Sequence, residues 1–142
     1  MTIGRLLDRR QSAVVTCNPE MSVADAASLL AERRIGALPV VSEGEPLGIF
    51  SERDVLYGLA REGAAVLDRT VREVMTTPAL TVARETSVLA ALSLMTLRRV
   101  RHLPVVEAGE LIGFVSIGDL VKVRIDQIES EAEALRSYIQ TV

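Results

Sequence analysis

The sequence contains an internal repeat at a constant offset of 65 residues. Residues 14–56 align with residues 79–121 without a gap, and 18 of the 43 aligned positions are identical. About half of the remaining positions are apolar in both copies. Agreement of this extent does not arise by chance, and a duplicated unit constrains a fold more than any single motif does. The chain is therefore expected to form two similar halves of one structure.

Each copy carries the same series of local structural signals. Short apolar runs at 14–16 and 79–82 predict a first strand in each copy. Ser22, followed by Asp25 in a capping box, and Ser87 in the second copy predict the start of a helix. A Leu-Pro-Val-Val segment then excludes helix and predicts a strand, and a glycine-containing acidic turn leads into a second hairpin strand. A Ser-x-x-Asp segment opens a second helix, so the predicted order is β-α-β-β-α, twice.

One such unit is too small to cover its own three-stranded sheet. Two units with their sheets packed face to face bury a shared apolar layer and leave the helices outside. The expected fold class is therefore α/β (α+β), with two equivalent clefts along the seam. The expected divisions are a first repeat at 1–62, a linker at 63–69, a second repeat at 70–124 and a C-terminal amphipathic helix at 125–142.

Composition excludes several classes of partner. The formal net charge is -3 with the charges interspersed, whereas a nucleic-acid-binding protein shows a basic face. No apolar run approaches the ~20 residues of a membrane span, and residues 1–7 lack the features of a secretory signal. Cys17 is the single cysteine, so it is expected to be a small buried apolar residue. We expect a soluble cytoplasmic protein without nucleic-acid or membrane partners.

Over residues 2–124 the chain resembles the CBS domain, named for cystathionine β-synthase, in the tandem arrangement called a Bateman module. The resemblance rests on the small-x-Pro-Val-Val strand entry, the Gly-x-x-Ser-x-x-Asp segment and the helix after it. All three recur in the second copy, where His102 stands in place of the small residue. It is similar to small stand-alone proteins with one CBS pair and no catalytic domain. The resemblance implies binding of AMP, ADP, ATP or related adenosine compounds such as NAD(H) in the clefts, and a homodimer.

The Ser51-x-x-Asp54 segment has two compatible interpretations. A serine and an aspartate at these positions form an ordinary helix N-terminus and need no ligand. An ionised aspartate also offers two acceptor oxygens to the hydroxyls of a ribose, and free amides at a helix start favour a phosphate. Ser116 and Asp119 repeat the pattern, which favours the binding interpretation.

Arg101 and His102 replace Gly36 and Ala37 of the first copy just before the strand. The resemblance implies that this position faces the ligand phosphate, which an arginine binds with paired donors. The alternative is a solvent-exposed loop. The preceding Arg98-Arg99 pair recurs in the first copy and is interpreted as a structural or solvated helix end.

The resemblance implies that each cleft combines the Asp segment of one repeat with the pre-proline loop of the other. One predicted cleft holds Ser51, Arg53, Asp54, Arg101 and His102, with Thr81 and Val82 beside the adenine. The other holds Ser116, Asp119, Gly36 and Ala37, with Thr16 and Cys17 beside the adenine and no cation. We therefore expect phosphorylated nucleotide to bind more tightly in the first cleft.

After the second repeat, six apolar residues recur at alternating spacings of four and three. They are Val121, Ile125, Ile128, Ala132, Leu135 and Ile139. This pattern is the a/d repeat of a helix seam. The seam either packs on its own module or is completed by a second chain, and we favour the second chain.

Three functions remain to be compared. The first is a non-catalytic regulatory module that senses adenosine nucleotides and signals energy or redox state to an unidentified protein. The second is a ligand-free interaction or scaffold protein that acts through its dimer surface and C-terminal helix. The third, an enzyme, is disfavoured because one His, one Cys and no phosphate-binding Gly-x-x-x-x-Gly-Lys loop leave no catalytic set.

Overall fold

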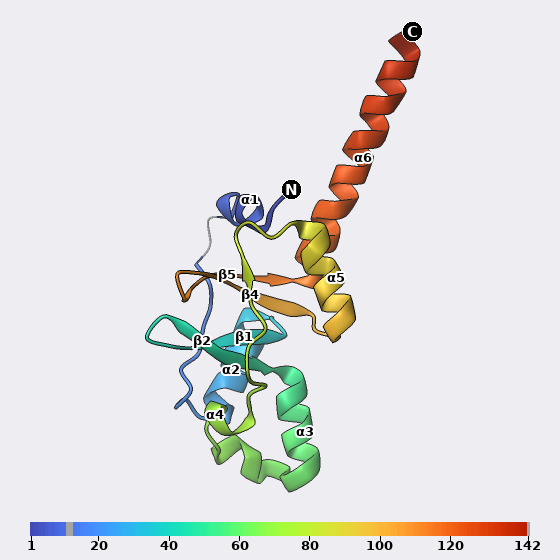
Figure 1. Cartoon of the computed structure of the whole chain (residues 1–142). Helices are drawn as coiled ribbons and strands as arrows, with labels where there is room; N and C mark the ends of the chain where they lie inside the picture. The colour runs from blue at the N-terminus through green and yellow to red at the C-terminus, as the bar shows by residue number, and fades with distance from the viewer. Residues whose placement is uncertain (11–12, 142) are drawn as a thin grey trace.

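The computed structural model describes residues 1–10 and 13–141 (Figure 1). In chain order the elements are α1 (Ile3–Asp8), α2 (Val23–Arg33), β1 (Ala37–Ser42), β2 (Glu45–Ser51), α3 (Glu52–Glu62), the 3-10 helix η1 (Gly63–Asp68), α4 (Val71–Val74), β3 (Val82–Ala83), α5 (Val88–Arg98), β4 (His102–Glu107), β5 (Glu110–Ser116) and α6 (Ile117–Thr141). The predicted duplication is visible in this order. The mixed α and β composition confirms the predicted fold class.

The two hairpins confirm the predicted central part of each repeat. Strands β1 and β2 pair antiparallel, as do β4 and β5, and both hairpins have a register shift at the same place, after Val40 and after Val105. Their turns place two consecutive residues at positive φ, Glu43 with Gly44 in one and Ala108 with Gly109 in the other. Two-residue turns of this kind match the twist of a hairpin. The hairpins are therefore built alike.

The first strand of each repeat is much shorter than the sequence predicts. In the first repeat, Cys17 makes a single parallel bridge to Val40, and residues 14–16 form no strand. In the second, β3 covers two residues and pairs parallel with β4. Pairing in the first repeat ends at once because the Asn18 side chain accepts the Glu20 N–H (2.8 Å) and turns the chain. The strand predictions at 14–16 and 79–82 were therefore wrong in extent.

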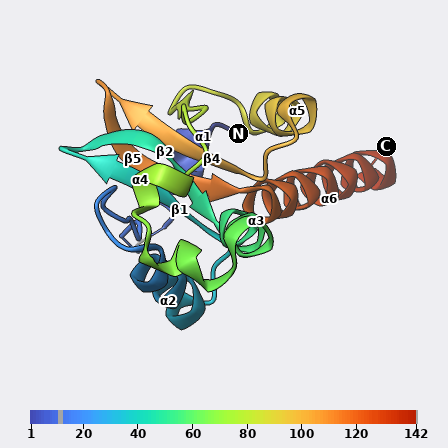
Figure 2. The same cartoon turned by 90° about the horizontal axis from the view of Figure 1, so that it is seen from below.

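The helices begin where the capping residues predict. Ser22 Oγ accepts the Asp25 N–H at 3.1 Å, and Ser87 Oγ accepts the Ala90 N–H at 3.0 Å. Helices α2 and α3 lie outside the β1–β2 hairpin, and α5 and the base of α6 lie outside β4–β5 (Figure 2). The hairpins face each other across the seam, with β2 in contact with β5.

The buried interior of the described residues is divided between the two halves. One cluster contains Cys17, Val23, Ala26, Leu30, Leu38, Val40, Phe50, Val66 and Val71. The other contains Ile3, Leu6, Val82, Val88, Ala91, Met95, Leu103, Val105, Val115 and Leu120. The seam was expected to be a shared buried layer. It is lined instead by half-buried side chains such as Ile49 and Phe114, because the clefts open there.

The segment that precedes each aligned stretch of the repeat, 14–56 and 79–121, packs against the half of the molecule that contains the other stretch. Ile3 and Leu6 of α1 belong to the core of the second half, and the Ile3 N–H donates to the Thr86 carbonyl (2.9 Å). Val66 of η1 and Val71 of α4 belong to the core of the first half. Contacts therefore cross the unit boundaries drawn from the sequence. This exchange decides which side chains reach each cleft.

Helix α6 is continuous from the second repeat through the predicted C-terminal helix. Its distal part projects beyond the two packed halves (Figure 1). No helix within the described residues combines the length and apolar character needed to cross a bilayer.

Candidate functional site

Asp54 and Asp119 occupy equivalent helix starts and are held there by the preceding serine. The N–H and Oγ of Ser51 donate to Asp54 Oδ2 at 2.8 and 3.2 Å. The Ser116 N–H donates to Asp119 Oδ2 at 2.8 Å, and Ser116 Oγ accepts the Asp119 N–H at 3.2 Å. The predicted capping role is confirmed in both repeats. Each aspartate nevertheless retains acceptor capacity on its other oxygen.

Asp54 lies in a cleft of ≈ 310 Å³ between the two halves. We call it the Asp54 cleft, and it is lined by Gly36, Ala37, Ile49, Ser51, Glu52, Arg53, Asp54, Tyr57, Thr76, Arg99, Val100, Arg101 and His102. The start of α3 and the loop before β4 thus face the same space, although they are far apart in the sequence. Its size falls within the range of about 300–1,000 Å³ that is usual for small-molecule sites.

The second oxygen of Asp54 accepts a hydrogen bond from a neutral group. Thr76 Oγ1 donates to Asp54 Oδ1 at 3.2 Å. Burial of the carboxyl raises the pKa of Asp54 above its usual value, and the hydrogen bonds from Ser51 and Thr76 oppose that rise only in part. Within the described residues, Asp54 forms no ion pair. A ligand that donates two hydroxyls would therefore meet a carboxylate that lacks a cationic partner.

Three arginines line the Asp54 cleft. Arg53 follows the helix start, Arg101 precedes β4, and Arg99 ends α5 in the left-handed conformation (φ 55°). None of the three takes part in an ion pair in the part of the chain that the structure describes. Arg99 was interpreted as structural from its place at a helix end. Arg99 does end α5, but it also lines the Asp54 cleft, so this interpretation was incomplete.

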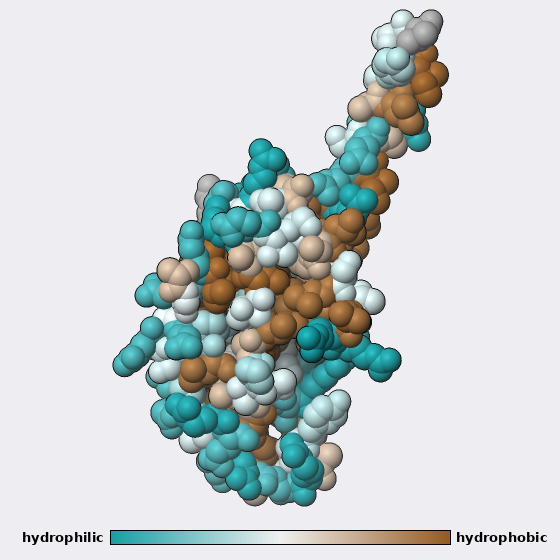
Figure 3. All heavy atoms as spheres, in the orientation of Figure 1, coloured by the Kyte–Doolittle hydropathy of each residue, from teal (hydrophilic) through white to brown (hydrophobic). Residues whose placement is uncertain are grey.

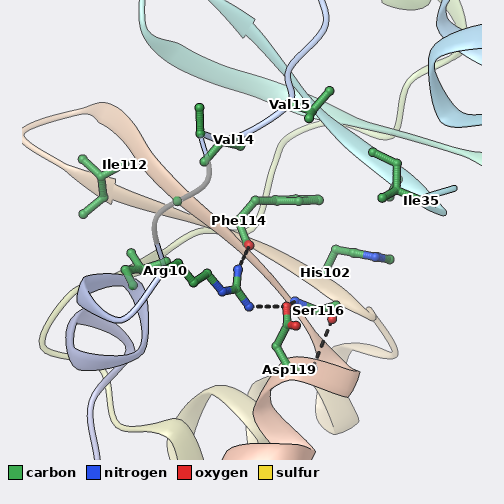
Figure 4. Close-up of a pocket in the computed structure, with 13 residues that line it drawn as sticks. Arg10, Val14, Val15, Ile35, His102, Ile112, Phe114, Ser116 and Asp119 are labelled. Carbon is green, nitrogen blue, oxygen red and sulfur yellow. Dashed lines mark hydrogen bonds and ion pairs between the residues drawn. The ribbon is translucent and has the colours of Figure 1, made fainter. Parts of the chain in front are cut away.

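Asp119 lies in a second cleft, of ≈ 430 Å³, lined by residues of both halves (Figure 4). We call it the Asp119 cleft, and it is lined by Leu7, Arg10, Ala13, Val14, Val15, Ile35, Ala37, His102, Ile112, Gly113, Phe114, Ser116 and Asp119. Most of these side chains are apolar. The polar groups gather at the start of α6.

Arg10 forms an ion pair with Asp119 inside this cleft. Its Nη2 lies 2.6 Å from Asp119 Oδ2, and its Nη1 donates to the Phe114 carbonyl at 3.0 Å (Figure 4). Burial alone would raise the pKa of Asp119, but the Ser116 N–H and Arg10 outweigh it and lower the pKa. The prediction of a cleft without a cation was wrong. Arg10 precedes the aligned repeat, and it reaches the cleft because α1 packs against the second half.

His102 lines both clefts, as does Ala37, its counterpart in the first repeat. The imidazole stacks on the Phe114 ring, with centroids 5.3 Å apart and planes 11° apart. Burial lowers the pKa of His102, and the nearby carboxylates Asp119 and Glu52 oppose this effect. A largely neutral His102 offers one ring N–H as a donor. His102 can therefore add one donor beside Arg101 but no positive charge.

Five predicted residues lie elsewhere than expected. Thr16, Cys17, Thr81 and Val82 do not line either cleft within the described residues; Cys17 and Val82 are core residues. Burial raises the pKa of the Cys17 thiol to about 11. The clefts are lined instead by residues earlier in the same segments, Ala13–Val15 and Thr76, because the strands begin later than predicted. Gly36 lines the Asp54 cleft rather than the Asp119 cleft.

These observations define a class of protein: a duplicated module whose two clefts lie between its halves. The family model described as CBS domain matches residues 9–61 and 71–126. The chain belongs to the CBS-domain family and contains two CBS units, which confirms the resemblance.

Two curated proteins illustrate the relationship. The CBS domain-containing protein CBSX3, mitochondrial, of Arabidopsis thaliana is 38% identical over 87% of this chain, which spans 63% of that protein. The CBS domain-containing protein YhcV of Bacillus subtilis is 31% identical over 88% of this chain and 86% of its own length. An inosine-5'-monophosphate dehydrogenase of Mycobacterium leprae is 38% identical, but the chain matches only 20% of that enzyme.

Solved structures share the paired architecture over most of this chain. A CBS-domain-containing protein of Agrobacterium tumefaciens superposes with a TM-score of 0.82 at 40% identity, over 87% of this chain and 99% of that chain. CBSX2 in complex with AMP superposes with a TM-score of 0.77 at 31% identity, over 90% of this chain and 98% of that chain. A protein similar to this one therefore binds an adenine nucleotide.

Proposed function

We propose that this chain is a non-catalytic regulatory module that binds an adenine nucleotide (AMP, ADP, ATP or NAD(H)) in the Asp54 cleft. The observation that carries the proposal is the arrangement around Asp54. A half-buried carboxylate without an ion-pair partner among the described residues lies at a helix start, and Arg99 and Arg101 line the same cleft from the other repeat. The AMP complex of CBSX2 supports the choice of ligand class.

Three groups of side chains in the cleft match the ribose, the phosphate and the adenine of a nucleotide. Asp54 accepts the ribose hydroxyls, whose hydrogen bonds to a charged acceptor replace lost hydration. Arg53 and Arg101 bind the phosphate, because guanidinium groups offer paired donors to phosphate oxygens. Apolar side chains such as Ile49 and Val100 provide the surface on which an adenine ring can pack.

The Asp119 cleft takes a less charged adenosine compound or remains empty. Its carboxylate is already paired with Arg10, so ribose hydroxyls must compete with a guanidinium for the same oxygens. Within the described residues Arg10 is the only arginine or lysine that lines this cleft. Phosphate binding there would therefore require Arg10 to leave Asp119.

Signalling follows from a shift of population. A nucleotide that contacts both repeats favours one relative arrangement of the halves, and a cytoplasmic partner protein reads that arrangement. We propose that the module acts as a homodimer.

An alternative function is that of a scaffold protein whose clefts stay empty. The large exposed apolar face of α6 favours this alternative as a second candidate.

Calorimetry with AMP on the full chain, Asp54→Ala and Asp119→Ala tests the proposal. We expect Asp54→Ala to weaken AMP binding by about 10- to 100-fold, the cost of losing hydrogen bonds to a charged group. Asp119→Ala should change it by less than about threefold, because that residue lies in the other cleft. Equal losses in the two variants, or no AMP binding by the full chain, would contradict the proposal.

A further inference from the structure

The distal half of α6 lies outside the part of the chain that the family explains. The CBS match ends at residue 126, whereas α6 continues to Thr141. We call the apolar stripe along this helix the α6 seam; it consists of Val121, Ile125, Ile128, Ala132, Leu135 and Ile139. Its five large residues are 41% to 65% exposed, and brown side chains follow the helix in Figure 3. A large continuous apolar stripe on a projecting helix needs a partner.

The flanks of the seam carry charges in a definite order. With Ile125 at position a and Ile128 at position d, Arg124 and Glu131 occupy g positions. Glu129 and Arg136 occupy the e positions. Residues 1–10 and 13–141 provide no ion-pair partner for any of these four charges. They are therefore available to a second helix.

We propose that the partner of the α6 seam is the same helix of a second copy, arranged parallel and in register. In a parallel two-stranded coiled coil each g residue faces the e residue of the next heptad in the partner. Arg124 then faces Glu129 of the partner subunit, and Glu131 faces Arg136 of the partner subunit. Both contacts occur twice by symmetry, so all four pairs are of opposite charge.

The antiparallel arrangement brings like charges together. If the two seams overlap fully in opposite directions, e positions face e positions and g positions face g positions. Glu129 and Glu131 then each face the same residue of the partner subunit, and Lys122, which is also at an e position, faces Arg136 of the partner subunit. Like charges across such a seam are destabilising. The charge order therefore favours the parallel arrangement.

The seam is too short to be independently stable. Val121 to Ile139 spans about 27 Å of helix, and helices of this size are marginal alone. Ala132 at a central a position adds little apolar area. The seam therefore acts together with contacts between the modules, and it holds both modules at the same end of the helix pair. This inference deepens the proposed homodimer and does not depend on nucleotide binding.

Disulfide formation between engineered cysteines distinguishes the two orientations in the full chain. In Leu135→Cys a parallel pair places the two new thiols in one layer, whereas full antiparallel overlap separates them by about 15 Å along the axis. Ser137→Cys, on the outer face, is the matched control, and buried Cys17 is present in both. We expect most Leu135→Cys chains to form a covalent dimer under mild oxidation and few Ser137→Cys chains to do so. Equal cross-linking of the two variants would overturn the proposal.

Charge exchange provides a second test that leaves the apolar seam intact. Glu131→Arg and Arg136→Glu should each weaken dimerisation by about threefold to tenfold, as expected for a few exposed ion pairs. The double variant restores the pairs and should recover the dimer, as measured by sedimentation. A monomeric full chain would overturn both the homodimer and this seam. A dimer without rescue would overturn only the parallel arrangement, and AMP calorimetry on the same samples reports nucleotide binding separately.

Discussion

The Asp54 and Asp119 clefts share one backbone design and differ in electrostatics. Both aspartates cap a helix and accept the N–H of the preceding serine at the same distance, 2.8 Å. The difference comes from the segment that precedes each repeat. That segment provides the hydroxyl of Thr76 in one cleft and the guanidinium of Arg10 in the other. A duplicated scaffold can therefore acquire two different sites through residues outside the aligned stretches 14–56 and 79–121.

The two strand glycines give the largest expected difference between the halves. A Cβ at Gly48 would lie 2.6 Å from the Thr76 backbone carbonyl, and one at Gly113 would lie 2.6 Å from the end of the Leu7 side chain. A side chain can rotate away but a paired backbone cannot. We expect Gly48→Ala to lower the free energy of unfolding by about 1–3 kcal/mol, as overpacking does, and Gly113→Ala to cost less than about 1 kcal/mol.

Denaturant unfolding of both variants measures this difference. Gly109→Ala is not a suitable control because Gly109 has a positive φ of 79°, whereas Gly118→Ala meets only the Ser116 Oγ at 3.7 Å. Gly118→Ala should therefore not lower stability, and it should raise it slightly because alanine favours the helix more than glycine does. Equal destabilisation by Gly48→Ala and Gly113→Ala would show that the backbone at Thr76 and the side chain of Leu7 adapt equally well. That result would contradict the expected difference between the two halves.

Removal of Arg10 should make the Asp119 cleft more similar to the Asp54 cleft. In an Asp54→Ala background, Arg10→Ala frees Asp119 to accept ribose hydroxyls. The ion pair is partly exposed, so we expect adenosine to bind about twofold to fivefold more tightly. Arg9→Ala is the matched control because Arg9 is exposed and does not line the cleft. Weaker adenosine binding after Arg10→Ala would mean that Arg10 holds the ligand rather than competing with it.

The smallest difference that we expect between the two clefts is the pH at which each aspartate is protonated. Burial raises the pKa of Asp54, whereas the Ser116 N–H and Arg10 lower that of Asp119 despite its burial. As the pH falls, Asp54 is protonated first, and AMP binding declines with it. The stabilisation from the Arg10–Asp119 pair persists above the ordinary aspartate pKa and is lost only as the pH falls through the lowered value. Carboxyl NMR of the two residues checks the order; the reverse order would contradict it.

The sequence predicted the halves well because their signals are local and occur twice. Ser22 and Ser87 begin helices as expected, and both acidic glycine turns close hairpins. The length of the first strands was predicted wrongly because an apolar run does not show how many of its residues pair with a neighbouring strand. Cys17 pairs with a single residue before the Asn18 turn redirects the chain.

The sequence predicted only those site residues that belong to a local, repeated motif. Asp54 and Arg101 are visible as motif residues and do line one cleft. Arg10 and Thr76 were missed because each precedes an aligned stretch of the repeat and reaches its cleft through tertiary packing. One available signal was the similarity between Thr2-Ile3-x-x-Leu6 and Thr70-Val71-x-x-Val74, which marks an equivalent helix before each half. An alignment restricted to the main repeat leaves that helix out.

The most direct test of the account is a calorimetric comparison of AMP with 2′-deoxy-AMP on the unmodified chain and on Asp54→Ala. We propose that Asp54 accepts hydrogen bonds from the ribose hydroxyls. Loss of the 2′-hydroxyl should therefore weaken binding to the unmodified chain by about tenfold and have little effect on Asp54→Ala. The same loss of affinity in both proteins would place the ribose away from Asp54 and contradict the account.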